Sequence, residues 1–113
     1  FAYLEIAQKQ YEDLAYQGYY NVGPDECDCV TTGELVTLFC DLWGDGAFWV
    51  NQHDGGPHEA NFLKLDCSKL KKTFGWKPHW HIQDAIEKTI VWSKAYLAGE
   101  DMRQVMDQQI EAY

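Results

Sequence analysis

Residues 66–78 read Asp66-Cys67-Ser68-Lys69-Leu70-Lys71-Lys72-Thr73-Phe74-Gly75-Trp76-Lys77-Pro78, and this stretch carries the start and stop signals of one short helix. Asp66 or Ser68 can accept hydrogen bonds from the amides at the helix start. Gly75 suits the left-handed position just after the helix, and Pro78 prevents its continuation. We therefore predict a helix over residues 68–74.

Apolar residues at helical spacing predict four further helices, over residues 3–17, 31–43, 82–97 and 101–113. Thr31 and Glu34 form a capping-box pattern, and Asp101 can cap the last helix. Gly18 and Gly99 end the first and third of these helices. No capping residue precedes the first one, so we expect the chain to begin inside a helix.

Three short runs rich in aromatic and branched residues predict strands, over residues 19–22, 47–50 and 62–65. A polar, glycine-rich loop over residues 51–59 separates the last two, and we expect the functional residues there. The predicted fold class is α/β, in the form of a mainly helical segment with a few short strands.

Charge and hydropathy exclude several classes of partner. The chain has 113 residues and a net charge of −9, which opposes binding to nucleic acid or to an anionic membrane. No apolar run approaches the roughly 20 residues of a membrane-spanning helix, and no N-terminal signal segment is visible. We expect a cytoplasmic protein.

Aromatic residues are abundant, with five Trp and seven Tyr. Such large side chains are either packed densely or leave an exposed patch where another domain belongs. The tryptophans are interpreted as core or interdomain packing, and Trp76 is predicted to be buried.

The chain contains four cysteines, namely Cys27, Cys29, Cys40 and Cys67. Their spacing forms neither a disulfide framework nor a pair of Cys-x-x-Cys knuckles, so reduced thiols are expected, with Cys40 buried. No metal ligand is assigned. A zinc site made by Cys27-x-Cys29 and His79-x-His81 is an alternative that rests on weak spacing.

Several motifs follow one another in the order found in one enzyme family. They are Tyr20-Asn21-Val22-Gly23, the predicted helix 31–43, Asp66-x-Ser68-Lys69 and Phe74-Gly75-Trp76-Lys77-Pro78. This succession resembles the C-terminal part of extended short-chain dehydrogenase/reductase enzymes that act on nucleotide sugars, whose Leu-Gly-Trp-x-Pro motif corresponds to the last element. The resemblance covers essentially all 113 residues.

Within that family the sugar-nucleotide 4,6-dehydratases are most similar. The matching segments are Asn21-Val22-Gly23-Pro24-Asp25, Leu42-Trp43-Gly44, Pro57-His58-Glu59-Ala60 and Leu65-Asp66-Cys67-Ser68-Lys69. The resemblance implies CDP-glucose as the substrate.

The resemblance implies an enzyme of two lobes, of which this chain corresponds to the smaller. Residues 1–113 are expected to form the C-terminal substrate-binding segment, and the N-terminal NAD-binding Rossmann domain is expected to lie outside this chain. The nine glycines form no Gly-x-Gly-x-x-Gly pattern, and no tyrosine is followed four residues later by a lysine. We therefore assign no catalytic and no cofactor-binding residue, and expect the missing domain to bind NAD.

In this family the loop before Asp66 commonly carries an arginine to the diphosphate and, three residues later, a carboxylate to a ribose hydroxyl. Counting back seven residues from Asp66 gives Glu59 for the carboxylate, which can accept two charge-assisted hydrogen bonds. The arginine position falls on Gly56, so diphosphate binding is left to His58, to glycine amides or to cations of the missing lobe. Glu59 and His58 are the predicted substrate-binding residues, with a solvent-exposed loop as the alternative.

For the complete enzyme, a lyase, the resemblance implies oxidation at C4 of the glucosyl unit by NAD, loss of water across C5 and C6, and return of the hydride to C6. The product would serve deoxysugar synthesis for lipopolysaccharide O-antigen. The chain alone is expected to be inert, and the complete enzyme to be a homo-oligomer. The alternatives are a fragment of another nucleotide-sugar dehydratase or epimerase, and a small protein-interaction module without enzymatic activity.

Overall fold

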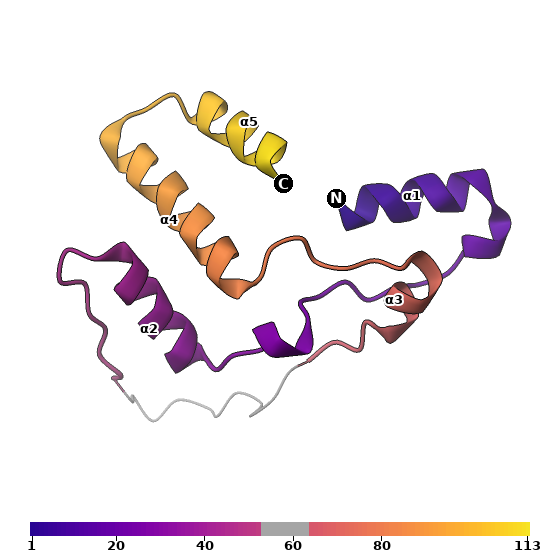
Figure 1. Ribbon diagram of the computed structural model, residues 1–113, viewed down its shortest axis with the longest axis horizontal. Helices are drawn as coiled ribbons and strands as arrows, with labels where there is room; N and C mark the ends of the chain where they lie inside the picture. The colour runs from indigo at the N-terminus through magenta and orange to yellow at the C-terminus, as the bar shows by residue number, and fades with distance from the viewer. Residues whose placement is uncertain (53–63) are drawn as a thin grey trace. The chain divides into compact units, whose positions relative to one another are not determined.

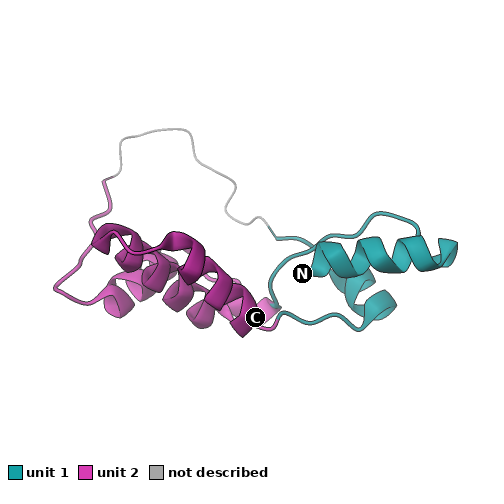
Figure 2. Cartoon of the chain, turned by 90° about the horizontal axis from the view of Figure 1, so that it is seen from above, with its two compact units in different colours: residues 1–25, 58–78 teal, residues 26–57, 79–113 magenta. Residues whose placement is uncertain are grey.

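The structure, a computed structural model, describes residues 1–52 and 64–113, which belong to two compact units. The first unit comprises Phe1–Asp25 and His58–Pro78, and the second comprises Glu26–Pro57 and His79–Tyr113 (Figure 2). Each unit therefore combines two segments that lie far apart in the sequence. Helices are the regular elements of both units, in the order labelled in Figure 1.

The first unit contains α1 (Ala2–Glu12), the 3₁₀ turn η1 (Leu14–Tyr16) and α3 (Ser68–Phe74). The prediction of one helix over residues 3–17 is wrong in its second half. Asp13 leaves the helix with an extended backbone, and its Oδ1 accepts a hydrogen bond from the Ala15 amide at 2.8 Å. A short acidic side chain that binds nearby amides in this way competes with a continued helix.

The predicted bounds of α3 are confirmed. Gly75 follows the helix in the left-handed region with φ 66°, and Asp66 Oδ1 accepts a hydrogen bond from the Ser68 amide at 2.9 Å. Leu70 is the buried centre of this unit, with 1% of its surface exposed. The prediction for Trp76 is wrong, because this residue is only half-buried. A side chain of that size is rarely covered completely.

The second unit contains η2 (Glu26–Asp28), α2 (Thr32–Trp43), α4 (Ile82–Ala98) and α5 (Met102–Ala112). Helix α4 packs against both α2 and α5 (Figure 1). The predicted ends of these helices are confirmed to within one or two residues. Thr31 and Glu34 form the expected capping box, Gly99 has φ 72°, and Asp101 Oδ1 accepts a hydrogen bond from the Arg103 amide at 3.0 Å.

The predicted α/β class is wrong where it includes short strands. The described residues form helices, turns and irregular segments with no strand. Runs 19–22 and 47–50 are irregular, and of run 62–65 the first two residues lie outside the described part. A strand is stabilised by backbone hydrogen bonds to a neighbouring strand. Runs 19–22 and 47–50 are instead kept in place by contacts of their side chains. The Tyr20 ring packs edge-on against Phe74 at 5.0 Å, and Trp49 Nε1 donates to Thr37 Oγ1 at 3.0 Å.

Few apolar side chains are buried. Among the described residues they are Ala2, Cys67, Leu70, Ile90 and Ala95. Cys40 is half-buried, contrary to the prediction, because no residue of α2 is fully covered. Both units expose large aromatic residues, such as Tyr19 at 96% and Phe48 at 82%. Apolar surface of this kind is typical of an interaction site. None of the described helices combines the length and the apolar character needed to cross a bilayer.

Candidate functional site

The predicted substrate-binding residues Glu59 and His58, like Gly56, lie outside the described residues. Their roles therefore remain predictions from the sequence. The structure does describe the residues on both sides of this segment, up to Gln52 before it and from Lys64 after it.

Residues 66–78, which follow the segment, contact residues 19–25 of the same unit, and we call these two stretches together the clasp. Asn21 Nδ2 donates to the Asp66 carbonyl oxygen at 3.1 Å, and Lys69 Nζ donates to the Tyr19 carbonyl oxygen at 3.1 Å. Two of the motifs that carried the family resemblance, around Asn21 and around Asp66, therefore contact each other.

Two further contacts complete the clasp. Lys71 Nζ forms an ion pair with Asp25 Oδ1. A side chain on Gly23 would place its Cβ only 3.3 Å from Cys67 Sγ, so glycine permits the two segments to approach closely. The clasp thereby fixes the position of Asp66, the residue from which Glu59 was counted.

Two of the three lysines of α3, Lys69 and Lys71, have structural partners within the first unit. Besides its bond to Tyr19, Lys69 Nζ lies 4.6 Å from the centre of the Tyr20 ring, a cation–π contact. Phe74 stacks on Tyr16 with 5.5 Å between ring centres. These contacts give Lys69 and Phe74 a packing role in the first unit.

Asp66 provides a pH-dependent contribution to the clasp. Hydrogen bonds from the Ser68 hydroxyl and then the Ser68 amide hold the pKa of Asp66 below its ordinary value, assisted by the charge of Lys72. Folding therefore favours the ionised carboxylate. Its stabilising effect is complete above the ordinary pKa and is lost as the pH falls through the lowered pKa.

We expect Asp66→Asn to lower stability at neutral pH and to flatten its decline below about pH 4, because asparagine has no carboxylate to protonate. Urea unfolding at a series of pH values measures this. Ser68→Ala, which removes one donor, should flatten the decline in part. Identical pH profiles for the wild type and Asp66→Asn would contradict the prediction.

Before the segment, in the second unit, Trp49 lies against the start of α2. Its Nε1 donates to Thr37 Oγ1, and Thr37 Oγ1 in turn donates to the Gly33 carbonyl oxygen at 2.8 Å. A Cβ on Gly33 would lie 3.6 Å from the Trp49 ring. This supports the interpretation of Trp49 as a packing residue, although 41% of it is exposed.

The start of α4 brings together three chemically different side chains. Asp28 is buried at 7% exposure, its Oδ1 accepts a hydrogen bond from the Ile82 amide at 3.0 Å, and its Oδ2 lies 2.9 Å from His81 Nδ1. The Ile82 amide and then His81 hold the pKa of Asp28 below its ordinary value. The Cys27 thiol completes the group, and the three candidate ligand atoms lie within 4.8 Å of one another.

Sequence reasoning missed Asp28 and chose a different set of metal ligands as the alternative. Of that set, Cys27 and His81 come together, whereas the His79 ring contacts Tyr113, with Nδ1 3.1 Å from its carbonyl oxygen. The position of Asp28 next to Cys27 was the only signal in the sequence, and an acidic residue there is too common to single out.

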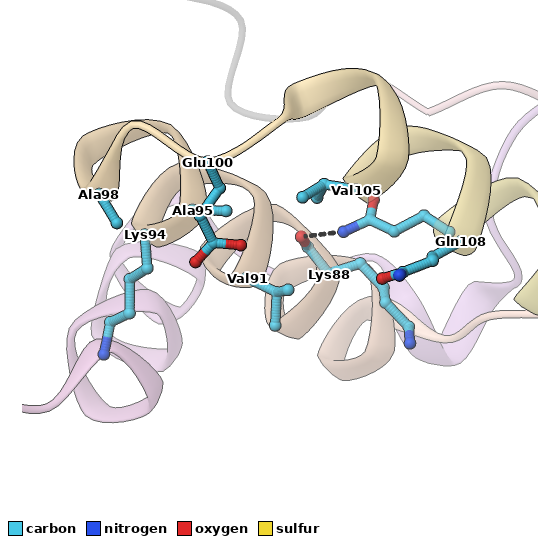
Figure 3. A pocket seen from close by; sticks show the side chains of 9 residues that line it. Lys88, Val91, Lys94, Ala95, Ala98, Glu100, Val105 and Gln108 are labelled. Atoms are coloured by element: carbon cyan, nitrogen blue, oxygen red, sulfur yellow. Dashed lines mark hydrogen bonds between the residues drawn. The ribbon is translucent and has the colours of Figure 1, made fainter.

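A groove of about 520 Å³ lies between α4 and α5 (Figure 3). Val91, Ala95 and Val105 contribute apolar surface, while Lys88 and Lys94 are the cations of its lining. Both cations are engaged: Lys94 Nζ donates to the Trp43 carbonyl oxygen at 2.8 Å, and Lys88 Nζ lies 5.7 Å from the centre of the Trp80 ring. We assign no ligand to this groove.

Comparison with known proteins agrees with the motifs. No family model matches the chain. CDP-glucose 4,6-dehydratase of Salmonella typhimurium is 37% identical over 112 residues, which is 98% of this chain but 31% of that enzyme. The chain therefore spans about a third of the length of the curated relative that it matches. The resemblance inferred from the motifs is thus confirmed, and the chain is similar over nearly its whole length to the C-terminal part of a CDP-glucose 4,6-dehydratase.

Proposed function

We propose that this chain is the substrate-binding C-terminal portion of a CDP-glucose 4,6-dehydratase. The observation that carries the proposal is the 37% identity over 98% of the chain. The hydrogen bond between Asn21 and Asp66 supports it further, because it joins two of the motifs on which the resemblance rests. The complete enzyme would convert CDP-glucose into CDP-4-keto-6-deoxyglucose with NAD as the internal hydride carrier.

In this proposal the NAD site and the acid and base groups belong to a Rossmann domain outside residues 1–113. The relative is about three times as long as the matched region, which leaves room for such a domain. The exposed aromatic side chains, such as Tyr19 and Phe48, supply apolar surface suited to packing against it or against a second subunit. The cytoplasmic location and the homo-oligomeric state remain predictions.

Within the chain we propose Glu59 and His58 as the groups that contact CDP-glucose. Glu59 would accept hydrogen bonds from ribose hydroxyls, and His58 would approach the diphosphate in place of the arginine that is replaced by Gly56. The clasp supports this, because it anchors Asp66 and so fixes one end of the short segment that carries both residues.

We expect the full-length protein to convert CDP-glucose, with NAD present, into a product with a 4-keto group, and the purified 113-residue chain to show no turnover. Chromatography and mass spectrometry detect the loss of one water from the sugar nucleotide. Matched reactions with UDP-glucose and dTDP-glucose test whether the enzyme prefers the cytosine nucleotide of its sugar substrate.

Faster conversion of another nucleotide sugar would favour the alternative dehydratase. No turnover of any sugar nucleotide by the full-length protein would instead favour a non-enzymatic interaction module. Turnover by the 113-residue chain alone would contradict the assignment of the catalytic groups to a separate domain.

A further inference from the structure

Cys27, Asp28 and His81 present a sulfur, an oxygen and a nitrogen atom to one small space. Cys27 and Asp28 belong to η2, whereas His81 immediately precedes α4, so about fifty residues of chain separate the two parts. The three candidate ligand atoms nevertheless lie within 4.8 Å of one another.

Capping of α4 explains only part of this arrangement. The Ile82 amide is satisfied by Asp28 Oδ1 at 3.0 Å, and the His81 amide is satisfied by Asp84 Oδ2 at 3.0 Å. Neither bond involves the Cys27 thiol or the second oxygen of Asp28, whereas the His81 side chain also takes part in the capping box that it forms with Asp84. The thiol and Asp28 Oδ2 therefore lie beside the His81 ring in addition to what the helix start requires.

The distances suit a small tetrahedral cation. Ligand atoms around zinc, with bonds of about 2.0–2.3 Å, lie about 3.3–3.6 Å from one another. His81 Nδ1 and Asp28 Oδ2, now 2.9 Å apart, would have to separate by a few tenths of an ångström. The Cys27 thiol, at most 4.8 Å from the other atoms, would have to approach by at most about 1.5 Å.

The burial of the three side chains also suits such a site. Asp28 is 5% exposed in its side chain and is oriented by the Ile82 amide, as a ligating carboxylate commonly is by a backbone group. Cys27 is exposed, and the His81 side chain is 59% exposed, so both can adjust to a cation that enters from solvent.

We propose that Cys27, Asp28 and His81 bind one zinc-type divalent cation, with water as the fourth ligand. The combination of a thiolate, an imidazole and a carboxylate is typical of zinc rather than of magnesium or calcium, which prefer oxygen ligands. The bound cation would cross-link η2 to the start of α4 within the second unit. Its expected role is structural, since no reacting group of the proposed dehydratase lies among these residues.

The test is zinc binding by the full-length protein after removal of metal with a chelator. Zinc is added, excess is dialysed away, and the metal-to-protein ratio is measured by elemental analysis. We expect Cys27→Ala and His81→Ala each to retain one equivalent less than the wild type and to bind zinc at least ~100-fold more weakly in competition with a chromogenic chelator. With Co²⁺ in place of zinc, the thiolate-to-cobalt absorption band should be missing in Cys27→Ala.

Cys29→Ala and His79→Ala are the matched controls, because each removes the same type of side chain two residues away and should retain the zinc. Cys27→Ala replaces an exposed residue outside the helix cap, so circular dichroism should show an unchanged helix content. His81 also caps α4, so the loss of zinc from His81→Ala counts only if its helix content equals that of the wild type. Asp28 is left intact because it also caps α4. Equal zinc content in the wild type and either ligand variant, or loss of zinc from either control, would overturn the proposed set of ligands.

Discussion

Leu70→Ala should lower the free energy of unfolding of the first unit by about 2–4 kcal/mol. Leu70 is the largest of the fully buried side chains among the described residues, with 1% of its surface exposed. Truncation removes the transfer free energy of the buried side chain and leaves a cavity inside the first unit. Hydrogen exchange of the α3 amides in the full-length protein reports the local opening free energy and measures the loss.

Lys72→Ala is the matched control for Leu70→Ala, because Lys72 is exposed on the same short helix. Lysine and alanine both favour helices, so the control should change the opening free energy by less than about 0.5 kcal/mol. Equal effects of the two substitutions would show that Leu70 is not the packing centre of the unit.

The helix ends could be predicted from the sequence because each depends on residues that are close together in the chain. The Thr31–Glu34 capping box, the left-handed Gly75 and Gly99, and the Asp101 cap each satisfy backbone groups within one turn. Such interactions need no knowledge of the rest of the fold. The bounds of α2, α3, α4 and α5 were accordingly close to those observed.

One wrong prediction concerns a segment whose structure depends on distant partners, and another concerns a local competition at the end of a helix. The run 19–22 has the composition of a strand, but Tyr20 packs on Phe74 and Tyr19 accepts a hydrogen bond from Lys69, fifty residues later. Local propensity cannot reveal such partners. In the helix predicted over residues 3–17, the apolar spacing continued past Asp13, and a single side chain bond to Ala15 outweighed it.

The residues of the candidate site also differ in whether the sequence alone could identify them. Motif spacing measured from Asp66 singled out Glu59, which lies outside the described residues and stays a prediction. The structure shows that Asn21 contacts Asp66 in the clasp. The group of Cys27, Asp28 and His81 could not be predicted as a set, because a chain separation of about fifty residues leaves no spacing rule.

Glu59→Ala in the full-length protein should raise the KM for CDP-glucose by about 10- to 100-fold, the loss expected for charge-assisted hydrogen bonds to ribose hydroxyls. The ribose is remote from C4, C5 and C6 of the glucosyl unit, so the contact should be similar in the ground and transition states and kcat should change little. Steady-state kinetics with CDP-glucose separates the two parameters.

Two further variants distinguish substrate contact from a general effect of charge on this acidic chain. Glu59→Gln keeps a hydrogen-bonding side chain but removes the charge, so its KM should lie between those of the wild type and Glu59→Ala. Glu111→Ala removes an exposed carboxylate at the end of α5 and should leave KM unchanged, because net charge alone does not make a specific ribose contact. If Glu59→Ala and Glu111→Ala have the same KM as the wild type, Glu59 is a solvent-exposed loop residue. If both lower KM alike, long-range repulsion of the anionic substrate by the net charge of −9 is the dominant effect.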